Sequence, residues 1–434
     1  MTTSNARQTT CKVQQQYEDF PYPYRDPNDE RTRFLFTPLD DLETLNFYCF
    51  NGRRNFRPAF RALVAGGGTG DATIHLAEQF KGTGATLVHV DLSKKSIEVA
   101  MRRAQVRGLD NVTWIQGSLL DLPDSNLEPF DYINCSGVLH HLPDPEAGLH
   151  ALRAMLKPGG AMGLMLYGTY GRTGIYQMQE MMRLINQGES NSSEKVANAR
   201  RVLETLPETN WFKRSADMFS TADSCDIELY DLLLHSTDRP FTVSEIHAFL
   251  KNEGLQLVEF LPGMRAMYDP VMTFRDPQLL ERVQQLPIEQ QQAAAELYWG
   301  VIKKHDFWAS TATDTVAKFE DHHNVPFFSS MASIHNVQAL IRSETRNEWV
   351  FEVDCKPLKV NLALELDAVT RRFVELIDGS RTTGEIMNTL SREFAGQRTA
   401  DDIWKTCRRT FESLRVYDLL LLRDLQVMPQ QRAA

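Results

Sequence analysis

The stretch 61-RALVAGGGTGD-71 decides how this chain folds. A short apolar run leads directly into a cluster of glycines and then into residues with helical spacing. Glycine lets the backbone turn sharply and approach a ligand closely, and the free N–H groups at the start of a helix favour anionic groups. The stretch therefore predicts a buried strand, a ligand-binding loop and a helix, which is the opening unit of an α/β fold.

The same alternation of short apolar runs and helical spacing continues along the chain. We predict strands at 62–65, 86–90, 112–115, 132–135 and 161–166, and helices at 71–80, 93–107 and 145–156. Strand, helix and strand in this order predict a doubly wound, mostly parallel sheet with helices on both faces. Runs at 255–261 and 306–310 would complete a seven-stranded sheet.

The segments around the sheet predict three further parts. Residues 174–186 and 192–205 have helical spacing and predict a helical cap, and Thr242 with Glu245 forms a capping box for a helix at 242–254. We divide the chain into an N-terminal arm or lid (1–60), a sheet domain (61–312, with its cofactor half at 61–168 and the cap and last strands at 169–312), a linker (313–330) and a C-terminal module (331–426).

The two ends of the chain leave alternatives open. Prolines at 21, 23 and 27 rule out a continuous helix in the arm, which is either a solvated tail or a lid whose aromatic residues cover a ligand. In the C-terminal module, helices at 371–377, from 382, and at 401–414, followed by a strand at 416–422, predict a small α+β winged-helix-like unit. That unit either binds peptides or serves as a capping or dimerising part.

Composition excludes several classes of function. The chain has 434 residues with a formal net charge of −10 and no long basic run, so we expect no nucleic-acid partner. It lacks an apolar run of the ~20 residues that a membrane span needs, and its N-terminus has no apolar signal segment. Its six cysteines are scattered, which favours a reducing, cytoplasmic setting and argues against a disulfide framework or a metal site.

The spacing of the glycines separates two kinds of nucleotide-binding loop. The dinucleotide fingerprint is G-x-G-x-x-G, whereas here the order is Gly66-x-Gly68-x-Gly70. Asp91 ends the next predicted strand, where a carboxylate can accept hydrogen bonds from both hydroxyls of a ribose. The alternative role for Asp91 is to cap the helix that begins near Ser93.

A pair of histidines follows the fourth predicted strand in 136-SGVLHHLPDP-145. Ligands of open α/β sheets bind at the carboxyl ends of the strands, so His140 and His141 can orient an acceptor or take its proton. The alternative is that they cap the next helix and seal the pocket.

Together these motifs resemble the class I, Rossmann-like methyltransferases that use S-adenosyl-L-methionine, over about residues 60–170. The resemblance implies S-adenosyl-L-methionine as cofactor and S-adenosyl-L-homocysteine as product. In that family the loop at 116–123 covers the adenine, although Ser118 stands where an acidic residue is common. The implied cofactor-binding residues are Tyr17, Gly66, Gly67, Gly68, Gly70, Asp71, Asp91, Leu92, Ser118, Leu119 and Ser136.

A narrower resemblance links 16-QYEDFPYP-23, the histidine motif and 167-YGTYGR-172 to a bacterial subfamily suspected of methylating protein side chains. We therefore expect a protein or peptide acceptor, with a small metabolite as the alternative and a non-catalytic nucleoside sensor as a third possibility; a homodimer is possible. Tyr17 and Tyr167 are expected in the wall of the acceptor pocket. The candidate catalytic residues are Tyr22, His140, His141, Tyr170 and Arg172.

Overall fold

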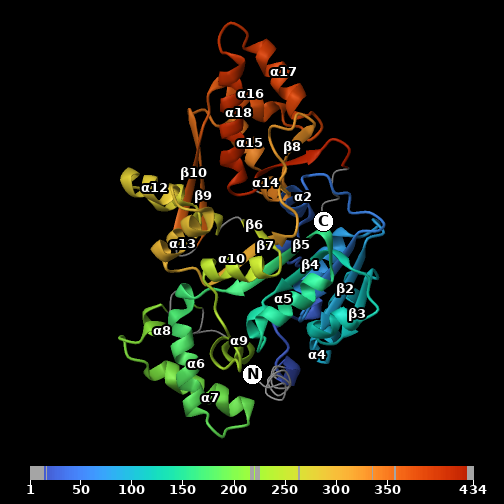
Figure 1. The fold of residues 1–434 in the computed structure, drawn as a ribbon, viewed down its shortest axis with the longest axis vertical. Coiled ribbons are helices and arrows are strands. Elements are labelled where there is room, and N and C mark those ends of the chain that lie inside the picture. Colours follow the sequence, from blue (N-terminus) through green and yellow to red (C-terminus); the bar gives the residue numbers. More distant parts are fainter. Residues whose placement is uncertain are drawn as a thin grey trace.

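The computed structural model describes residues 14–427 except 16, 216–218, 220–224, 262–263, 335 and 356–357. Its centre is a seven-stranded sheet with the strand order β3-β2-β1-β4-β5-β7-β6 (Figure 1). Neighbouring strands from β3 to β5 are parallel, and β7 runs antiparallel to both β5 and β6. The predicted doubly wound, mostly parallel sheet is confirmed. Its strands are β1 (Arg61–Ala65), β2 (Thr86–Asp91), β3 (Val112–Gln116), β4 (Phe130–Ser136), β5 (Leu156–Tyr167), β6 (Gln256–Phe260) and β7 (Lys304–Ser310).

Helices cover both faces of this sheet because successive side chains of each buried strand point to opposite sides. In β1, Ala62 and Val64 pack with α2 (Leu42–Cys49) and α3 (Asp71–Gln79), whereas Leu63 and Ala65 pack on the opposite face, with α5 (Pro145–Ala154) and α10 (Val243–Asn252). The remaining helix of the sheet, α4 (Lys94–Val106), contacts β2, β3 and α3.

Side chains at the helix starts fix where these helices begin. Ser93 accepts a hydrogen bond from the Ser96 N–H at the start of α4, and Asp144 accepts one from Ala147 at the start of α5. Thr242 and Glu245 form the predicted capping box of α10. Such caps satisfy N–H groups that have no partner within the helix.

The chain between β5 and α10 forms the predicted helical cap, the green helices in the lower part of Figure 1. It consists of α6 (Thr173–Ile185), α7 (Ser192–Thr205), α8 (Trp211–Arg214) and α9 (Asp226–Leu233). The cap has its own apolar cluster, which includes Ile175, Met178 and Leu229. Between β6 and β7 lie α11 (Pro270–Thr273), α12 (Pro277–Gln284) and α13 (Ile288–Trp299).

The segment predicted as an N-terminal arm has two parts. All eight residues of α2 are buried, and Tyr48 of this helix stacks on Trp308 of β7 with ring centroids 5.1 Å apart. The second half of the segment is therefore part of the core and not a lid. The earlier part, described from Gln14, lies over the glycine-rich loop after β1.

The C-terminal module contains the three expected helices, α16 (Ala368–Leu376), α17 (Thr383–Glu393) and α18 (Ala400–Arg415). Two short helices and four strands accompany them. Of these, the sequence predicted only the last strand, and the predicted strand began too early in the chain. These six elements are β8 (Asn324–Phe328), α14 (Ser330–Ile334), α15 (Val337–Ser343), β9 (Glu348–Cys355), β10 (Leu358–Glu365) and the last strand, β11 (Leu420–Asp424). The winged-helix resemblance of this α+β unit stays a prediction.

Two boundaries of this module differ from the expectation. The strand expected at 416–422 begins only at Leu420, because the chain first turns through Asp418, which has a positive φ of 51°. Residues 313–330 are packed rather than forming a linker: Ala317 donates its N–H to the Phe47 carbonyl (2.8 Å), and β8 pairs with β11.

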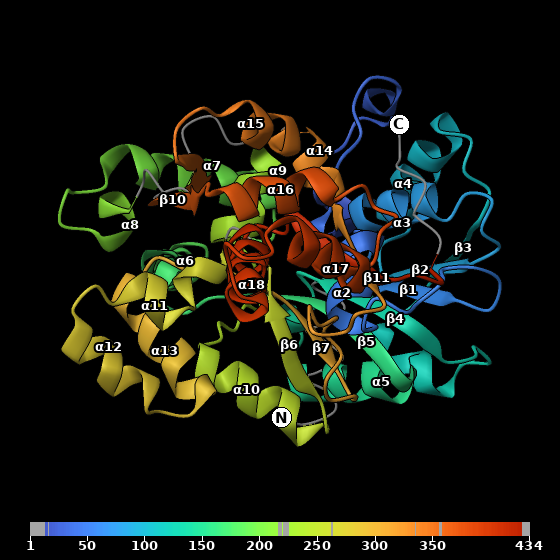
Figure 2. The same ribbon diagram turned by 90° about the horizontal axis from the view of Figure 1, so that it is seen from above.

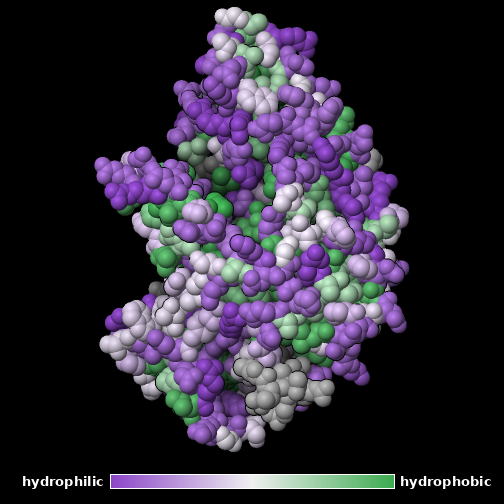
Figure 3. All heavy atoms as spheres, in the orientation of Figure 1, coloured by the Kyte–Doolittle hydropathy of each residue, from purple (hydrophilic) through white to green (hydrophobic). Residues whose placement is uncertain are grey.

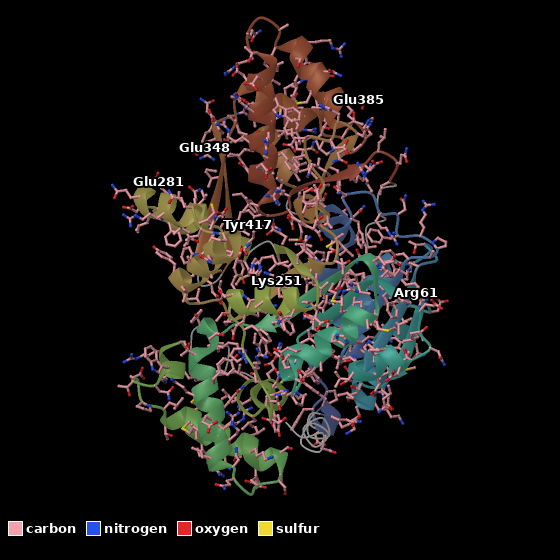
Figure 4. All side chains as sticks on the ribbon, in the orientation of Figure 1. Arg61, Lys251, Glu281, Glu348, Glu385 and Tyr417 are labelled. Atoms are coloured by element: carbon pink, nitrogen blue, oxygen red, sulfur yellow. The ribbon has the colours of Figure 1, made fainter. Side chains whose placement is uncertain are left out.

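The C-terminal module sits directly on the sheet domain. Figure 2 shows α18 above α2 and the β6–β7 edge, and the rings of Phe47 and Phe411 are 6.3 Å apart. At the junction, beside the labelled Tyr417 in Figure 4, Asp418 accepts a 2.5 Å hydrogen bond from Tyr48 and forms an ion pair with Arg265 (3.1 Å). The two parts therefore share one apolar core and a buried charged contact.

In the described part of the chain, no helix combines the length and the apolar character that a membrane crossing needs. The face shown in Figure 3 is mostly hydrophilic, with small hydrophobic areas between the helices. Cys49, Cys135, Cys225 and Cys407 are free thiols. The side chain of Cys355 and all of Cys11 lie outside the described residues.

Candidate functional site

The glycine-rich loop after β1 owes its shape to the absence of side chains. Gly66, Gly68 and Gly70 have positive φ angles of 71°, 52° and 100°, which L-residues rarely adopt. A Cβ atom on Gly66 would lie 2.5 Å from a methyl group of Val138, and one on Gly68 would lie 2.6 Å from the Tyr22 carbonyl oxygen. The loop is therefore a narrow cradle between the β4 side of the sheet and the N-terminal segment.

Asp91 at the end of β2 holds this cradle in place. Its carboxylate accepts hydrogen bonds from the N–H groups of Gly68 and Ser93, each at 2.8 Å. Burial raises the pKa of Asp91. The capping of α4 is carried out by the Ser93 side chain, which leaves the remaining lone pairs of Asp91 available to a ligand. This geometry suits the ribose role expected for Asp91.

Residues from five strand ends and from the N-terminal segment surround one cavity of about 1070 Å³, measured out to its mouth. Its lining brings together most of the residues expected to bind the cofactor, and two of the candidate catalytic residues. These are Tyr17, Tyr22, Gly66, Gly67, Gly68, Asp91, Leu92, Ser118, Leu119, Ser136 and His141.

The residues implied to bind S-adenosyl-L-methionine offer groups that suit this molecule. The cradle of Gly66 and Gly68 has no room for a side chain, and Asp91 supplies a buried carboxylate. The Ser118 hydroxyl accepts a hydrogen bond from the Leu120 N–H (3.2 Å) at the edge of the loop expected to cover the adenine. Asp121, in the same loop, is exposed and does not line the cavity.

Gly70 and Asp71 lie outside the lining. A Cβ on Gly70 would come within 2.8 Å of the Ala100 Cβ, so this glycine allows α3 and α4 to pack closely. Asp71 forms ion pairs with Arg25 (2.6 Å) and Arg103 (2.7 Å). Both residues position the loop and the N-terminal segment.

The N-terminal segment closes one side of the cavity. The Tyr22 carbonyl accepts a hydrogen bond from the Thr69 N–H (3.3 Å), and the Pro23 carbonyl accepts one from the Thr69 hydroxyl (2.7 Å). Arg25 adds its ion pair to Asp71. These contacts favour the interpretation of the first half of the arm as a lid over a ligand.

Three candidate catalytic residues do not line the cavity. Tyr170 begins the short helix before α6 and is only partly buried. Arg172 lies behind Tyr167, with its guanidinium 3.6 Å from the ring centroid, and pairs with Asp238 at 3.2 Å. His140 stacks on Tyr167 with centroids 4.0 Å apart, and burial holds the pKa of His140 well below its usual range.

Sequence reasoning missed one cavity residue that carries charge. Asp231 of α9 is 5% exposed and points into the cavity, where the hydroxyls of Tyr17 and Tyr167 each lie 3.4 Å from one of its oxygens. The available signal was a carboxylate within the apolar run 229-LYDLLL-234, since a charged residue in such a run is costly unless it has a role. Only the fold brings α9 to the carboxyl end of the sheet.

Residues 63–162 match a family model described as a methyltransferase domain. An uncharacterised protein of Synechococcus sp. is 29% identical over 79% of this chain and 80% of its own length. The tRNA 5-carboxymethoxyuridine methyltransferase of Escherichia coli is 35% identical, but over only 26% of this chain and 41% of its own length. The ubiquinone biosynthesis O-methyltransferase of Actinobacillus pleuropneumoniae is 26% identical over 50% of this chain and 84% of its own length.

Among solved structures, PKMT2 from Rickettsia typhi in complex with AdoHcy superposes with a TM-score of 0.61. The match covers 90% of this chain and 76% of that chain at 17% sequence identity. At that identity it establishes the fold alone, and it extends well beyond the methyltransferase domain at 63–162.

Proposed function

We propose that this S-adenosylmethionine-dependent methyltransferase of class I fold transfers a methyl group to a side chain of a protein or peptide. The observation that carries the proposal is a groove of about 1310 Å³ beside the acceptor end of the cavity. It runs between the N-terminal segment and the helices α6, α7 and α9, and it offers polar and apolar side chains to an extended segment. A metabolite that fits within the cavity needs no such surface.

The groove and the cavity are separated by single residues. On α9, Tyr230 lines the groove and its neighbour Asp231 lines the cavity. His235 lines the groove and contacts Tyr17 of the cavity, its Nε2 atom lying 3.3 Å from the tyrosine hydroxyl. A side chain from a polypeptide bound in the groove is therefore separated from the cofactor cavity by this thin wall alone.

The shared architecture adds support. PKMT2 of Rickettsia typhi, solved in complex with AdoHcy, matches this chain over 90% of its length, so the match includes parts of the cap and of the C-terminal module as well as the sheet. The E. coli relative that acts on tRNA matches only about a quarter of the chain. The net charge of −10 also suits a protein partner better than a polyanion.

Different residues of the chain bind the cofactor and surround the acceptor. When bound, S-adenosyl-L-methionine supplies a methyl group that its sulfonium has already activated. Asp91 and the glycine cradle hold the cofactor side, while Tyr17, Tyr22 and Tyr167 wall the acceptor side and exclude water. Holding the two reacting groups in line in such a closed space accounts for much of the rate enhancement in bimolecular transfers.

The test uses extract from a strain that lacks this protein, the purified protein and tritium-labelled S-adenosyl-L-methionine, with products separated by size. Label in a discrete protein band is expected. Label confined to small molecules, or label that ribonuclease releases, would contradict the proposal. Absence of all label while S-adenosyl-L-homocysteine still binds would favour a sensor. An Asp91→Ala variant serves as the control that must give no label.

A further inference from the structure

Both backbone polar groups of Thr237 contact histidines at the acceptor end of the cavity. Its N–H donates to Nδ1 of His235 (3.1 Å), and its carbonyl oxygen lies 3.0 Å from Nδ1 of His141. The two rings are stacked with centroids 3.7 Å apart. Because a carbonyl oxygen only accepts, Nδ1 of His141 carries a proton; because an N–H only donates, Nδ1 of His235 does not. Thr237 thus gives the two histidines opposite roles at Nδ1, a donor in His141 and an acceptor in His235.

These hydrogen bonds assign different roles to the two histidines. Because Nδ1 of His141 is the atom that donates to Thr237, Nε2 is the nitrogen left to accept a proton, and the His141 side chain lines the cavity. Burial holds the pKa of His235 well below its usual range, so His235 is neutral and its Nε2–H donates to Tyr17 (3.3 Å). The Tyr17 hydroxyl in turn donates to Asp231 (3.4 Å). His141 can therefore accept a proton from a bound molecule, whereas His235 orients Tyr17.

Asp231 has no directly paired cation among the described residues, and the charge of Arg172, which pairs with Asp238, acts on it only at longer range. Its contacts are the two tyrosine hydroxyls at 3.4 Å, and no ion pair to it is formed by any residue that the structure describes. Burial raises its pKa, as expected for a carboxylate removed from water. A ligand cation would offset that cost, and the rings of Tyr17, Tyr22 and Tyr167 in the same cavity can add cation–π stabilisation.

We propose that the acceptor is an amine, which binds as an ammonium ion against Asp231 and gives its proton to Nε2 of His141. This inference rests on the proposed function and names the acceptor class of the same site. A carboxylate acceptor would be repelled by Asp231. A hydroxyl acceptor would leave the buried Asp231 without a counter-ion from the acceptor.

The proposed methyl transfer accounts for every proton and electron pair. His141 removes one proton from the ammonium nitrogen, which frees the lone pair that a nucleophile needs. That lone pair forms the new N–C bond while the C–S bond of the cofactor breaks, and the bonding pair stays on sulfur. The product is a methylated ammonium that remains paired with Asp231, and protonated His141 returns its proton to solvent after the product leaves.

The groups around His141 suit this exchange. Around it lie Asp231 from α9, Tyr167 from β5, His140, His235 and Asp238. The charge of Arg172 is offset by Asp238 at 3.2 Å. Asp231 is left to stabilise the positive charge that His141 takes up.

The first test examines the chemistry of the label obtained with tritiated S-adenosyl-L-methionine. Label in protein that resists alkali and is recovered as an N-methylated amino acid supports the inference. Label in protein that alkali releases as methanol, or that resides on oxygen or sulfur, overturns the inference while the proposed function stands. Label found only on a small amine overturns the proposed function and retains the amine assignment.

A second test measures binding without turnover. Sinefungin carries an ammonium where S-adenosyl-L-homocysteine has only sulfur, so it presents a cation at the acceptor end. Asp231→Asn should weaken sinefungin by about ten-fold or more relative to S-adenosyl-L-homocysteine. Asp226→Asn, on the same helix but exposed and paired with Arg200, should leave the ratio unchanged. An unchanged ratio in Asp231→Asn would overturn the role of Asp231.

The same titration run with Zn²⁺ alone tests a rival occupant, because ligand atoms of His141, Asp231 and His235 lie within 4.8 Å of one another. Tight Zn²⁺ binding that Asp231→Asn abolishes would replace the ammonium site by a metal site. Weak Zn²⁺ binding that the Asp231→Asn variant leaves unchanged supports the ammonium assignment.

His141→Asn tests the base. Asparagine can still donate to the Thr237 carbonyl but has no atom in place of Nε2. Turnover should fall by about 10²–10⁴-fold and rise about ten-fold per pH unit toward the amine pKa of about 10.4, where solvent supplies the free amine. The affinity for S-adenosyl-L-homocysteine should stay unchanged. Wild-type turnover in His141→Asn would overturn the assignment.

Discussion

Replacing Asp91 by alanine should abolish productive cofactor binding. The carboxylate accepts two backbone N–H groups at 2.8 Å, from Gly68 in the cradle and Ser93 at the start of α4. Hydrogen bonds to a charged group contribute about 1.5–3 kcal/mol each. Two such bonds to ribose hydroxyls therefore amount to at least about 3 kcal/mol, which corresponds to a loss in affinity of at least about 100-fold.

Isothermal titration with S-adenosyl-L-homocysteine measures this loss directly. Asp124→Ala provides the matched control, because Asp124 is an exposed carboxylate that does not line the cavity and its removal should leave the affinity unchanged. The unfolding midpoint of Asp91→Ala must be measured in parallel, since the Gly68 and Ser93 N–H groups lose their acceptor. A folded Asp91→Ala protein whose affinity stays within about three-fold of wild type would refute the ribose assignment.

Two further predictions concern stability. Tyr48→Phe removes the hydroxyl that donates to buried Asp418 at 2.5 Å, and it should lower the free energy of unfolding by about 1.5–3 kcal/mol; an unchanged denaturation midpoint would show that the junction does not depend on this bond. Burial lowers the pKa of His89 from 6.5 to about 3, so on acidification the unfolded chain takes up a proton that the folded chain refuses. The free energy of unfolding should therefore fall as pH drops from 6.5 toward 3, by up to about 1.4 kcal/mol per pH unit from this residue. In thermal melts across that pH range, His89→Gln should lose less stability than the wild type. Identical slopes for the two proteins would contradict this prediction.

The sheet could be predicted from the sequence because its determinants are local. Each buried strand is a short apolar run, and helix starts carry caps such as Ser93 and Thr242 that act within three residues. The cradle could also be predicted from a short stretch of sequence, because consecutive glycines indicate a backbone that has no room for side chains. These features need no knowledge of distant contacts.

The remaining parts depend on contacts between distant segments. The helix α2 has little amphipathic pattern because it is buried on all sides, between the sheet and the C-terminal module. The segment at 313–330 contains β8, whose partner β11 follows nearly a hundred residues later. Asp231 lies more than 60 residues from Tyr167, and only the return of the cap brings the two together. For the same reason, Tyr170 and Arg172 could be assigned to the region of the site but not to its lining.

The most direct test of the account is mass spectrometry of proteins labelled with trideuteromethyl S-adenosyl-L-methionine in extract from a strain lacking this protein. The account predicts peptides that carry the trideuteromethyl group on a side-chain amine, present with the wild-type protein and with Asp226→Asn, and absent with Asp231→Asn. Trideuteromethyl groups found only on small molecules, or on protein carboxylates or hydroxyls, would contradict it.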